Sequence, residues 1–167
     1  MAFMRAAAAV TAAIGYLALA AAGVAAQERR VVGNWHIVTE RDRFTDQPRV
    51  LAVTAASGHL LAVRCFSGNL SVMLIEGDSA SGPFQAGAKF QVMSRVDKSE
   101  VWTEVGTAVD QRGIQLDLPA FMFARIVTGK EVAFRVTNEV GSYKDWIFPL
   151  RRQKEALAPV ADACGLK

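Results

Sequence analysis

The stretch "HLLAVRCFSGNLSVMLIE", residues 59–76, decides the fold. Apolar side chains alternate along its first half, with Leu61, Val63 and Cys65 on one side, and the alternation resumes after residues 67–69. A period of two is typical of a β-strand that is buried on one face. The "SGN" between the two halves favours a tight turn, because Gly and Asn accept positive φ. The stretch therefore predicts an antiparallel hairpin that carries Cys65 on its apolar side.

The same alternation recurs through the chain, in short runs separated by Gly, Ser, Asp and Pro. These runs predict about nine strands joined by turns. Two segments break the rhythm and predict helices. One covers residues 119–128, with Pro119 in its first turn and Gly129 just past its end, and the other covers residues 151–165, where Pro159 should kink or break it. Because no crossover helices alternate with the strands, the pattern predicts a mainly β fold. We expect an antiparallel β sandwich or open barrel with a short helix near 119–128 and a C-terminal helix.

Residues 1–26 predict a secretory signal peptide. Arg5 is the one charged residue of this segment, and residues 6–22 are rich in Ala, Val, Ile and Leu. Small residues up to Ala26 suit a signal peptidase, so we expect cleavage before Gln27. The alternative is a retained anchor, which so much alanine disfavours, because a spanning helix needs about 20 strongly apolar residues. We therefore expect a periplasmic or secreted protein with no stable membrane anchor after cleavage, whose residues 27–167 form a single β-rich domain.

Cys65 and Cys164 are the two cysteines of the chain. In a small exported domain, two cysteines most simply form one disulfide. This bridge would tie the C-terminal segment to a central strand and stabilise the fold by about 2–4 kcal/mol. Two free buried thiols, and redox or catalytic cysteines, remain as alternatives. His36 and His59 lie in no ligand motif, so we expect no metal and no cofactor.

Charge and motifs exclude several classes of function. The chain has 19 Lys and Arg against 16 Asp and Glu, scattered singly, and no basic stripe with interleaved aromatic residues. Nucleic-acid binding is therefore not expected. We find no Gly-x-Ser-x-Gly elbow, no phosphate-binding glycine loop and no acid–base pair in the sequence. These observations favour a protein that is not an enzyme.

Three arginines and one aspartate are candidates for a binding patch. Arg64 and Arg135 lie on expected strands, and Arg95 and Asp97 flank the end of another. Guanidinium groups match carboxylates and phosphates, so the functional interpretation of these residues is an anion-binding or peptide-binding patch. The alternative is that the arginines are ion-paired or face solvent, with Arg95 and Asp97 ordering their own turn.

The aromatic residues are more typical of a core, with one exception. In the "FMF" of Phe121 to Phe123, three bulky side chains follow one another on a short helix. All three cannot face one core. We therefore expect one of them to point toward a partner or an overlying loop, and we include Phe121 and Phe123 in the possible binding patch.

The order of several short motifs resembles a known family of exported proteins. "GNWHIV" is followed by "LLAVRC", "SRVD", "VWTE", "FMFARIVTGKEVAFRV" and "EALAPVADACG". This order resembles the VasI-like proteins, which are associated with bacterial type VI secretion. The matching residues are Trp35, Asp46, Arg64, Cys65, Arg95, Asp97, Trp102, Arg135 and Cys164. The resemblance implies an exported accessory protein with no established catalytic chemistry. Our leading interpretation is a non-enzymatic accessory protein that works through contacts with protein partners in the cell envelope.

The sequence lacks one motif of each of the two families that it resembles. VasI-like proteins carry a Pro-x-Asp-Asp run in the first loop, where this chain has "RFTDQP" with Asp46 alone in place. The chain also resembles the invasion-associated locus B family, which is small, exported and β-rich, through "AFMFARIVTGKEVAFRV", but it lacks that family's early cysteine. The alternative function is a small-ligand or carbohydrate-binding β-sandwich module. The sequence does not indicate an oligomeric state.

Overall fold

The structure, a computed structural model, describes residues 27–77 and 83–166. The signal peptide expected at residues 1–26 lies outside the described residues, so its cleavage stays a prediction. Within the described ranges, no helix is both long enough and apolar enough to span a bilayer.

Ten strands and two helices make up the described chain. The strands are β1 (Glu28–Val32), β2 (Trp35–Arg41), β3 (Pro48–Ala56), β4 (His59–Phe66), β5 (Asn69–Glu76), β6 (Lys89–Val96), β7 (Trp102–Ala108), β8 (Gly113–Asp117), β9 (Glu131–Thr137) and β10 (Tyr143–Pro149). The helices are α1 (Ala120–Thr128) and α2 (Gln153–Ala163). The mainly β fold with a short helix near 119–128 and a C-terminal helix is thereby confirmed.

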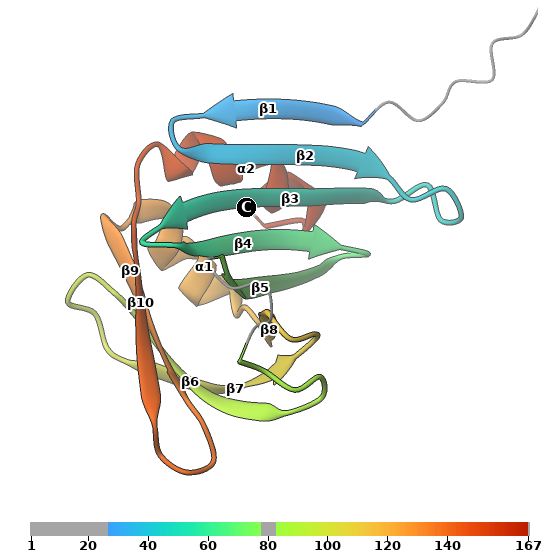
Figure 1. The fold of residues 1–167 in the computed structure, drawn as a ribbon. Coiled ribbons are helices and arrows are strands. Elements are labelled where there is room, and N and C mark those ends of the chain that lie inside the picture. Colours follow the sequence, from blue (N-terminus) through green and yellow to red (C-terminus); the bar gives the residue numbers. More distant parts are fainter. Residues whose placement is uncertain (1–26, 78–82, 167) are drawn as a thin grey trace, which may run out of the picture.

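All ten strands form one antiparallel sheet in the order β1-β2-β3-β4-β5-β8-β7-β6-β9-β10. The hairpin predicted from residues 59–76 is β4–β5, and its register places Cys65 opposite Leu70. β7 and β8 share a short stretch of pairing that includes Thr107 and Gln115, and the sheet turns there. β10 consequently comes back beside β3 (Figure 1). The sheet is thus curled and open, as an open barrel or sandwich requires.

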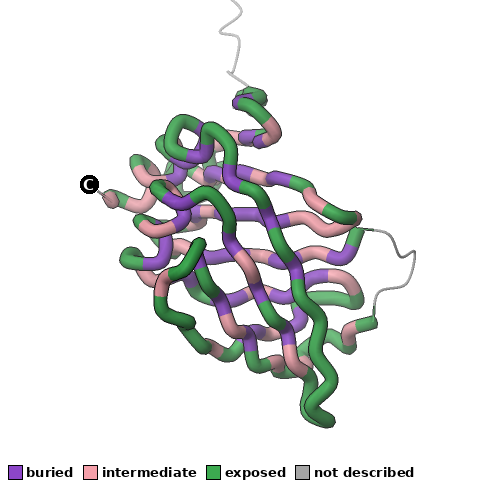
Figure 2. The backbone as a smooth tube through the Cα atoms, turned by 90° about the vertical axis from the view of Figure 1, so that its left-hand side faces the viewer, coloured by how far each residue is buried: buried purple, intermediate pink, exposed green. Residues whose placement is uncertain are grey.

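The core lies between the curled sheet and the helices. Trp35, Leu61, Phe134, Trp146 and Leu157 come from distant parts of the chain and are each at most 1% exposed. Buried and exposed residues alternate along the strands (Figure 2), as the period of two predicts. Burying one large apolar side chain contributes about 1.5–3 kcal/mol. This core is therefore the main source of stability.

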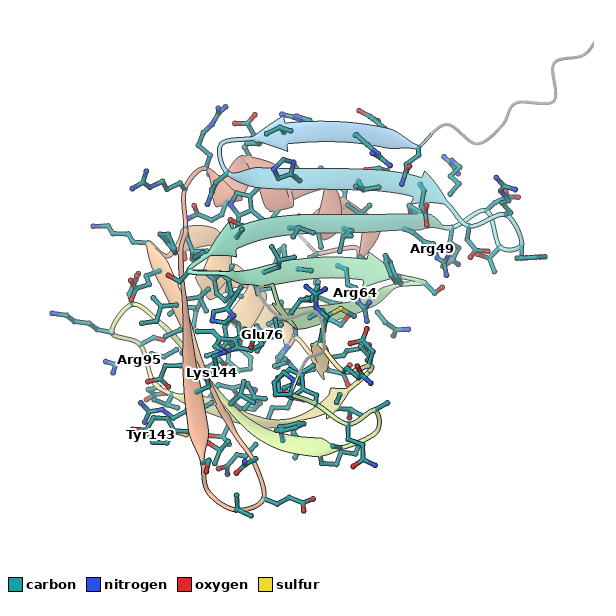
Figure 3. The ribbon with its side chains drawn as sticks, in the orientation of Figure 1. Arg49, Arg64, Glu76, Arg95, Tyr143 and Lys144 are labelled. Carbon is teal, nitrogen blue, oxygen red and sulfur yellow. A yellow bond between two sulfur atoms is a disulfide. The ribbon has the colours of Figure 1, made fainter. Side chains whose placement is uncertain are left out.

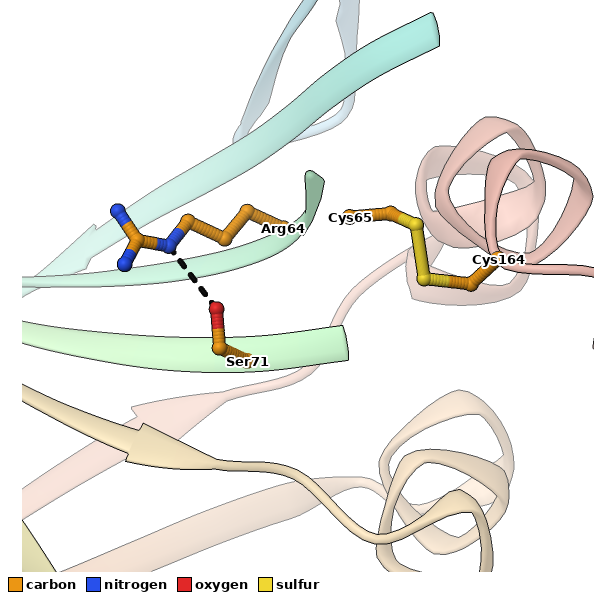
Figure 4. The surroundings of a disulfide bond; sticks show 4 residues. All are labelled: Arg64, Cys65, Ser71 and Cys164. Atoms are coloured by element: carbon orange, nitrogen blue, oxygen red, sulfur yellow. Dashed lines mark hydrogen bonds between the residues drawn. A yellow bond between two sulfur atoms is a disulfide. The ribbon is translucent and has the colours of Figure 1, made fainter. Parts of the chain in front are cut away.

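Cys65 and Cys164 form the expected disulfide, with their Cα atoms 5.7 Å apart. Cys65 is fully buried in β4, and Cys164 follows the last turn of α2 (Figure 4). No free cysteine remains in the described part of the chain. The bridge therefore excludes the alternative of two free thiols, and it ties the C-terminal helix to the middle of the sheet.

Two details differ from the sequence expectations. The tenth strand, β1, was missed because "ERRVV" carries charges instead of alternation; only its Val32 is buried, and it pairs with β2 alone. Charged edge strands of this kind discourage pairing with other chains. Of the two alternatives for Pro159, the break was wrong, because α2 runs through this residue, and the kink stays a prediction. Burial of Ala156, Leu157 and Val160 holds the helix on both sides of the missing N–H.

Candidate functional site

Two of the three candidate arginines lie together on the outer face of the sheet. Arg95 of β6 stands opposite Ala133, and Arg135 of β9 stands opposite Met93. Paired and alternate residues share one face, so both guanidinium groups point to the same side. With Ile147 of β10 they line a shallow hollow of about 210 Å³.

The Arg135 guanidinium is already paired. Its Nε and Nη2 donate hydrogen bonds to the two carboxylate oxygens of Asp145, each at 2.7 Å, and its Cζ lies 4.3 Å from the centre of the Tyr143 ring. These hydrogen bonds raise the pKa of Arg135 and lower the pKa of Asp145. Arg95, by contrast, forms no ion pair with any residue in the described ranges. Arg95 is thus the cation of the hollow that can receive an external carboxylate.

Asp97 stabilises a turn through hydrogen bonds and forms no ion pair with Arg95. Its Oδ1 accepts hydrogen bonds from the backbone N–H groups of Lys130 and Glu131, both at 3.0 Å. Its own N–H donates to the Glu131 carbonyl at 3.0 Å. The carboxylate therefore holds the end of β6 against the start of β9, and the structure does not bring Asp97 into a binding patch.

The two phenylalanines of the "FMF" motif separate. Phe123 and Met122 lie in the core at 5% and 0% exposure, whereas Phe121 is 43% exposed. The Phe121 ring meets Trp102 of β7 edge to face, with the ring centroids 5.0 Å apart. Trp102 is itself 38% exposed. The expectation that one residue of the three points outward is confirmed, and that residue forms an exposed aromatic pair with Trp102.

Arg64 lies apart from the other two arginines. In Figure 3, Arg64 and Arg49 are on one side of the molecule, whereas Arg95 and Tyr143 are on the other. Arg64 also points away from its neighbour Cys65 (Figure 4). The predicted patch is therefore two separate surfaces, one around Arg95 and one around Arg64.

A cluster that the sequence analysis missed joins β4, β5 and β10. Glu76 is 5% exposed, and its Oε2 accepts a hydrogen bond of 2.8 Å from Nζ of Lys144 (Figure 3). Its Oε1 lies 3.2 Å from Nδ1 of His59. That nitrogen has no hydrogen-bond partner in the described residues, so the contact is close but poorly aligned. His59 also stacks on Trp146, with the ring centroids 4.8 Å apart.

The register of the β4–β5 hairpin predicts one pair of this cluster, His59 with Glu76. The turn that places Cys65 opposite Leu70 also places His59 opposite Glu76. The sequence analysis treated His59 as isolated because it compared neighbours along the chain and not across the turn. Lys144 comes from β10, and no local pattern indicates it. Nowhere in residues 27–77 or 83–166 do three His, Cys, Asp or Glu side chains gather where they could hold a metal ion.

A second hollow, of about 200 Å³, opens beside the cluster. Phe84, Phe90, Tyr143, Lys144 and Trp146 contribute to its lining. The Phe84 and Phe90 rings meet edge to face, with the centroids 5.2 Å apart. Aromatic walls with one ammonium group suit a small planar ligand or a sugar.

Comparisons with known proteins bear on the fold. The sequence matches no protein-family model and no curated protein. The crystal structure of invasion associated protein B from Bartonella henselae is similar, with a TM-score of 0.54 and 11% sequence identity, over 81% of this chain and 96% of that chain. At this identity the likeness establishes a shared fold. It is consistent with the resemblance to the invasion-associated locus B family, whereas the VasI-like resemblance finds no match among these comparisons.

Proposed function

We propose that this chain is a non-enzymatic exported protein that acts through protein contacts in the cell envelope. The observation that carries the proposal is the exposed aromatic pair of Trp102 and Phe121. Val101, which precedes Trp102, is 48% exposed and adds apolar area at the start of β7. Trp102 pairs with Ser94 and so faces the α1 side of the sheet, whereas Arg95 and its hollow lie on the outer face. We define the contact surface as Val101, Trp102 and Phe121.

The chemistry of the contact surface favours a protein partner. Aromatic residues and Arg are enriched where proteins bind one another. Trp102 and Phe121 hold each other in place, so little side-chain entropy is lost on binding. Arg125, whose Cζ lies 5.5 Å from the Phe121 ring centre, adds positive charge. The partner that fits is a protein surface with apolar side chains and at least one carboxylate opposite Arg125.

Three further observations support the exported, envelope-associated part of the proposal. Disulfides such as Cys65–Cys164 persist in oxidising compartments. Residues 1–26 have the pattern of a signal peptide. The fold is also shared with a protein named for its association with invasion. The finer proposal, from the VasI-like resemblance, is an accessory role in a secretion or envelope assembly.

In vivo cross-linking tests the contact surface. A photoreactive phenylalanine analogue at position 101 should capture a periplasmic partner, and the double variant Trp102→Ala with Phe121→Ala should lose it. Phe44→Ala is the matched control, because Phe44 is 98% exposed and lies in the β2–β3 turn outside the contact surface. The proposal is wrong if the folded double variant captures the same partner as well as the control does.

A second candidate, a small-ligand or carbohydrate-binding module, is favoured by the hollow beside Trp146. Tryptophan fluorescence can follow titrations of the mature protein with simple sugars and small aromatic compounds. We expect Tyr143→Ala to weaken any binding, because Tyr143 lines the hollow and is 63% exposed. If no probe changes the tryptophan fluorescence, the small-ligand function is wrong. That result would not bear on the proposed contact surface.

A further inference from the structure

We propose that Arg64 is the centre of an oxyanion-binding site on the outer face of β4, separate from the contact surface. The ligand group is a carboxylate or a phosphate. The site is built from β4, β5 and β8, and its floor is the ring of Phe66.

Neighbouring strands hold the Arg64 side chain in one position. Its Nε donates a hydrogen bond of 2.9 Å to Oγ of Ser71 (Figure 4), and its Nη2 donates to the side-chain carbonyl of Gln115. Its Cζ lies 5.1 Å from the centre of the Phe66 ring. A guanidinium that is fixed before binding loses little entropy when a ligand arrives.

The charge of Arg64 is not balanced by the described part of this chain. Ser71 and Gln115 are neutral, and Arg64 forms no ion pair with any described carboxylate. Burial lowers the pKa of Arg64, as it must for a cation that has lost water without gaining a counter-charge. An anion that binds there would supply the missing counter-charge.

Arg49, on the next strand, provides a contrast. It stands opposite Phe66, and its Cζ lies 5.4 Å from the centre of the same ring. Unlike Arg64, it has two carboxylates nearby, since its Nε is 3.4 Å from Asp42 and its Nη1 is 3.7 Å from Glu40. Among the described residues, Arg64 therefore differs from Arg49 in having no carboxylate within ion-pair distance.

The free donors of Arg64 define the ligand. A guanidinium has five N–H groups. Ser71 takes the one on Nε and Gln115 takes one on Nη2, so the remaining Nη2 group and both Nη1 groups have no partner in the described residues. Adjacent Nη1 and Nη2 donors match the two oxygens of a carboxylate or phosphate in a fork. The apolar ring below them limits access of water and strengthens the attraction.

A titration of the isotope-labelled mature protein tests the site. Inorganic phosphate or acetate is added at constant ionic strength, and the Nε–H signal of Arg64 is followed by NMR, with chloride as the reference anion. We expect a saturable shift with a millimolar Kd. A shift with acetate alone identifies a carboxylate-bearing ligand, and one with phosphate alone identifies a phosphate source. The absence of a saturable shift with both anions overturns the proposal.

Three variants separate the site from general charge effects. Gln115→Glu places a carboxylate beside Arg64, so it should abolish anion binding and raise the Tm. Arg64→Lys keeps the charge without the fork and should bind about tenfold more weakly. Arg43→Gln, at an exposed arginine of the β2–β3 turn, should bind like the wild type. Unchanged affinity in Gln115→Glu, with the protein folded and its disulfide intact, would contradict the site.

Discussion

Gly129 is required for a reason that its position in the sequence does not reveal. Glycine after a helix usually supplies a left-handed backbone, but the φ of Gly129 is −77°. A Cβ at this position would lie 2.2 Å from Cγ1 of Val96 and 3.0 Å from the Arg125 carbonyl oxygen. The absence of a side chain therefore lets the end of α1 approach β6.

Gly129→Ala is expected to destabilise the protein by about 1–3 kcal/mol, because the added methyl overpacks a buried contact. Chemical denaturation measures the change. Gly68→Ala serves as the comparison, since nothing lies within 4 Å of its Cβ but its φ is +75°, which costs about 1 kcal/mol. A smaller loss at Gly129 than at Gly68 would show that α1 adjusts easily and would contradict the packing argument.

Among the elements, the β2–β3 turn depends on one carboxylate. Oδ1 of Asp42 accepts hydrogen bonds from the backbone N–H groups of Phe44 at 2.9 Å and Thr45 at 3.0 Å. The hydrogen bond from Phe44, and then that from Thr45, lower the pKa of Asp42. A lowered carboxyl pKa means that ionised Asp42 stabilises the turn at neutral pH.

The order of this turn should therefore depend on pH. It is expected to be complete above about pH 4, and to be lost as the pH falls through the lower pKa of the folded state. The amide chemical shifts and exchange rates of Phe44 and Thr45 report the change. In Asp42→Asn the same amides should not titrate in this range. Identical titration curves in the variant would assign the effect to another group.

Helix α2 allows a second test at the level of single elements. It contains Pro159 without a break, so the cost of this proline to the stability of the helix can be measured. Pro159→Ala restores an N–H for the helix ladder and should stabilise the protein by about 1–3 kcal/mol. Ala158→Gly, at an exposed neighbour, should destabilise it by about 1 kcal/mol. Urea denaturation compares the two. No gain in Pro159→Ala would mean that the ring contributes packing as large as the missing hydrogen bond.

Local sequence patterns predicted the helices and strands. The order of the strands and the faces that distant residues share depend on pairing between segments far apart in the chain. Alternation and turn residues located the β4–β5 hairpin, and Pro119 and Gly129 bounded α1 correctly. The sequence could not place β8 beside β5 or β6 beside β9, because those neighbours are set by packing across the core. For the same reason it could nominate Arg95 and Arg135 but not show that they share a face, or that Arg64 does not.

On the scale of the whole molecule, the curled sheet is joined by one covalent link between distant segments. The disulfide connects β4 to the end of α2 across a sequence separation of 99. The segment between its ends includes β5 to β10 and both helices. In the unfolded chain the bridge restricts this long loop, so its main effect is to lower the entropy of unfolding.

Removing the bridge by the double change Cys65→Ser with Cys164→Ser should therefore lower the free energy of unfolding by about 2–4 kcal/mol. Part of the loss is local, because Cys65 is fully buried and a serine hydroxyl there has no assigned partner. Cys164→Ala with Cys65→Ala separates this contribution from that of the cross-link. A reductant should lower the Tm of the wild type and leave both double variants unchanged. If reduction leaves the wild-type Tm unaltered, then α2 is held to the sheet by burial of Leu157 and Val160 alone, and the bridge has no share in stability.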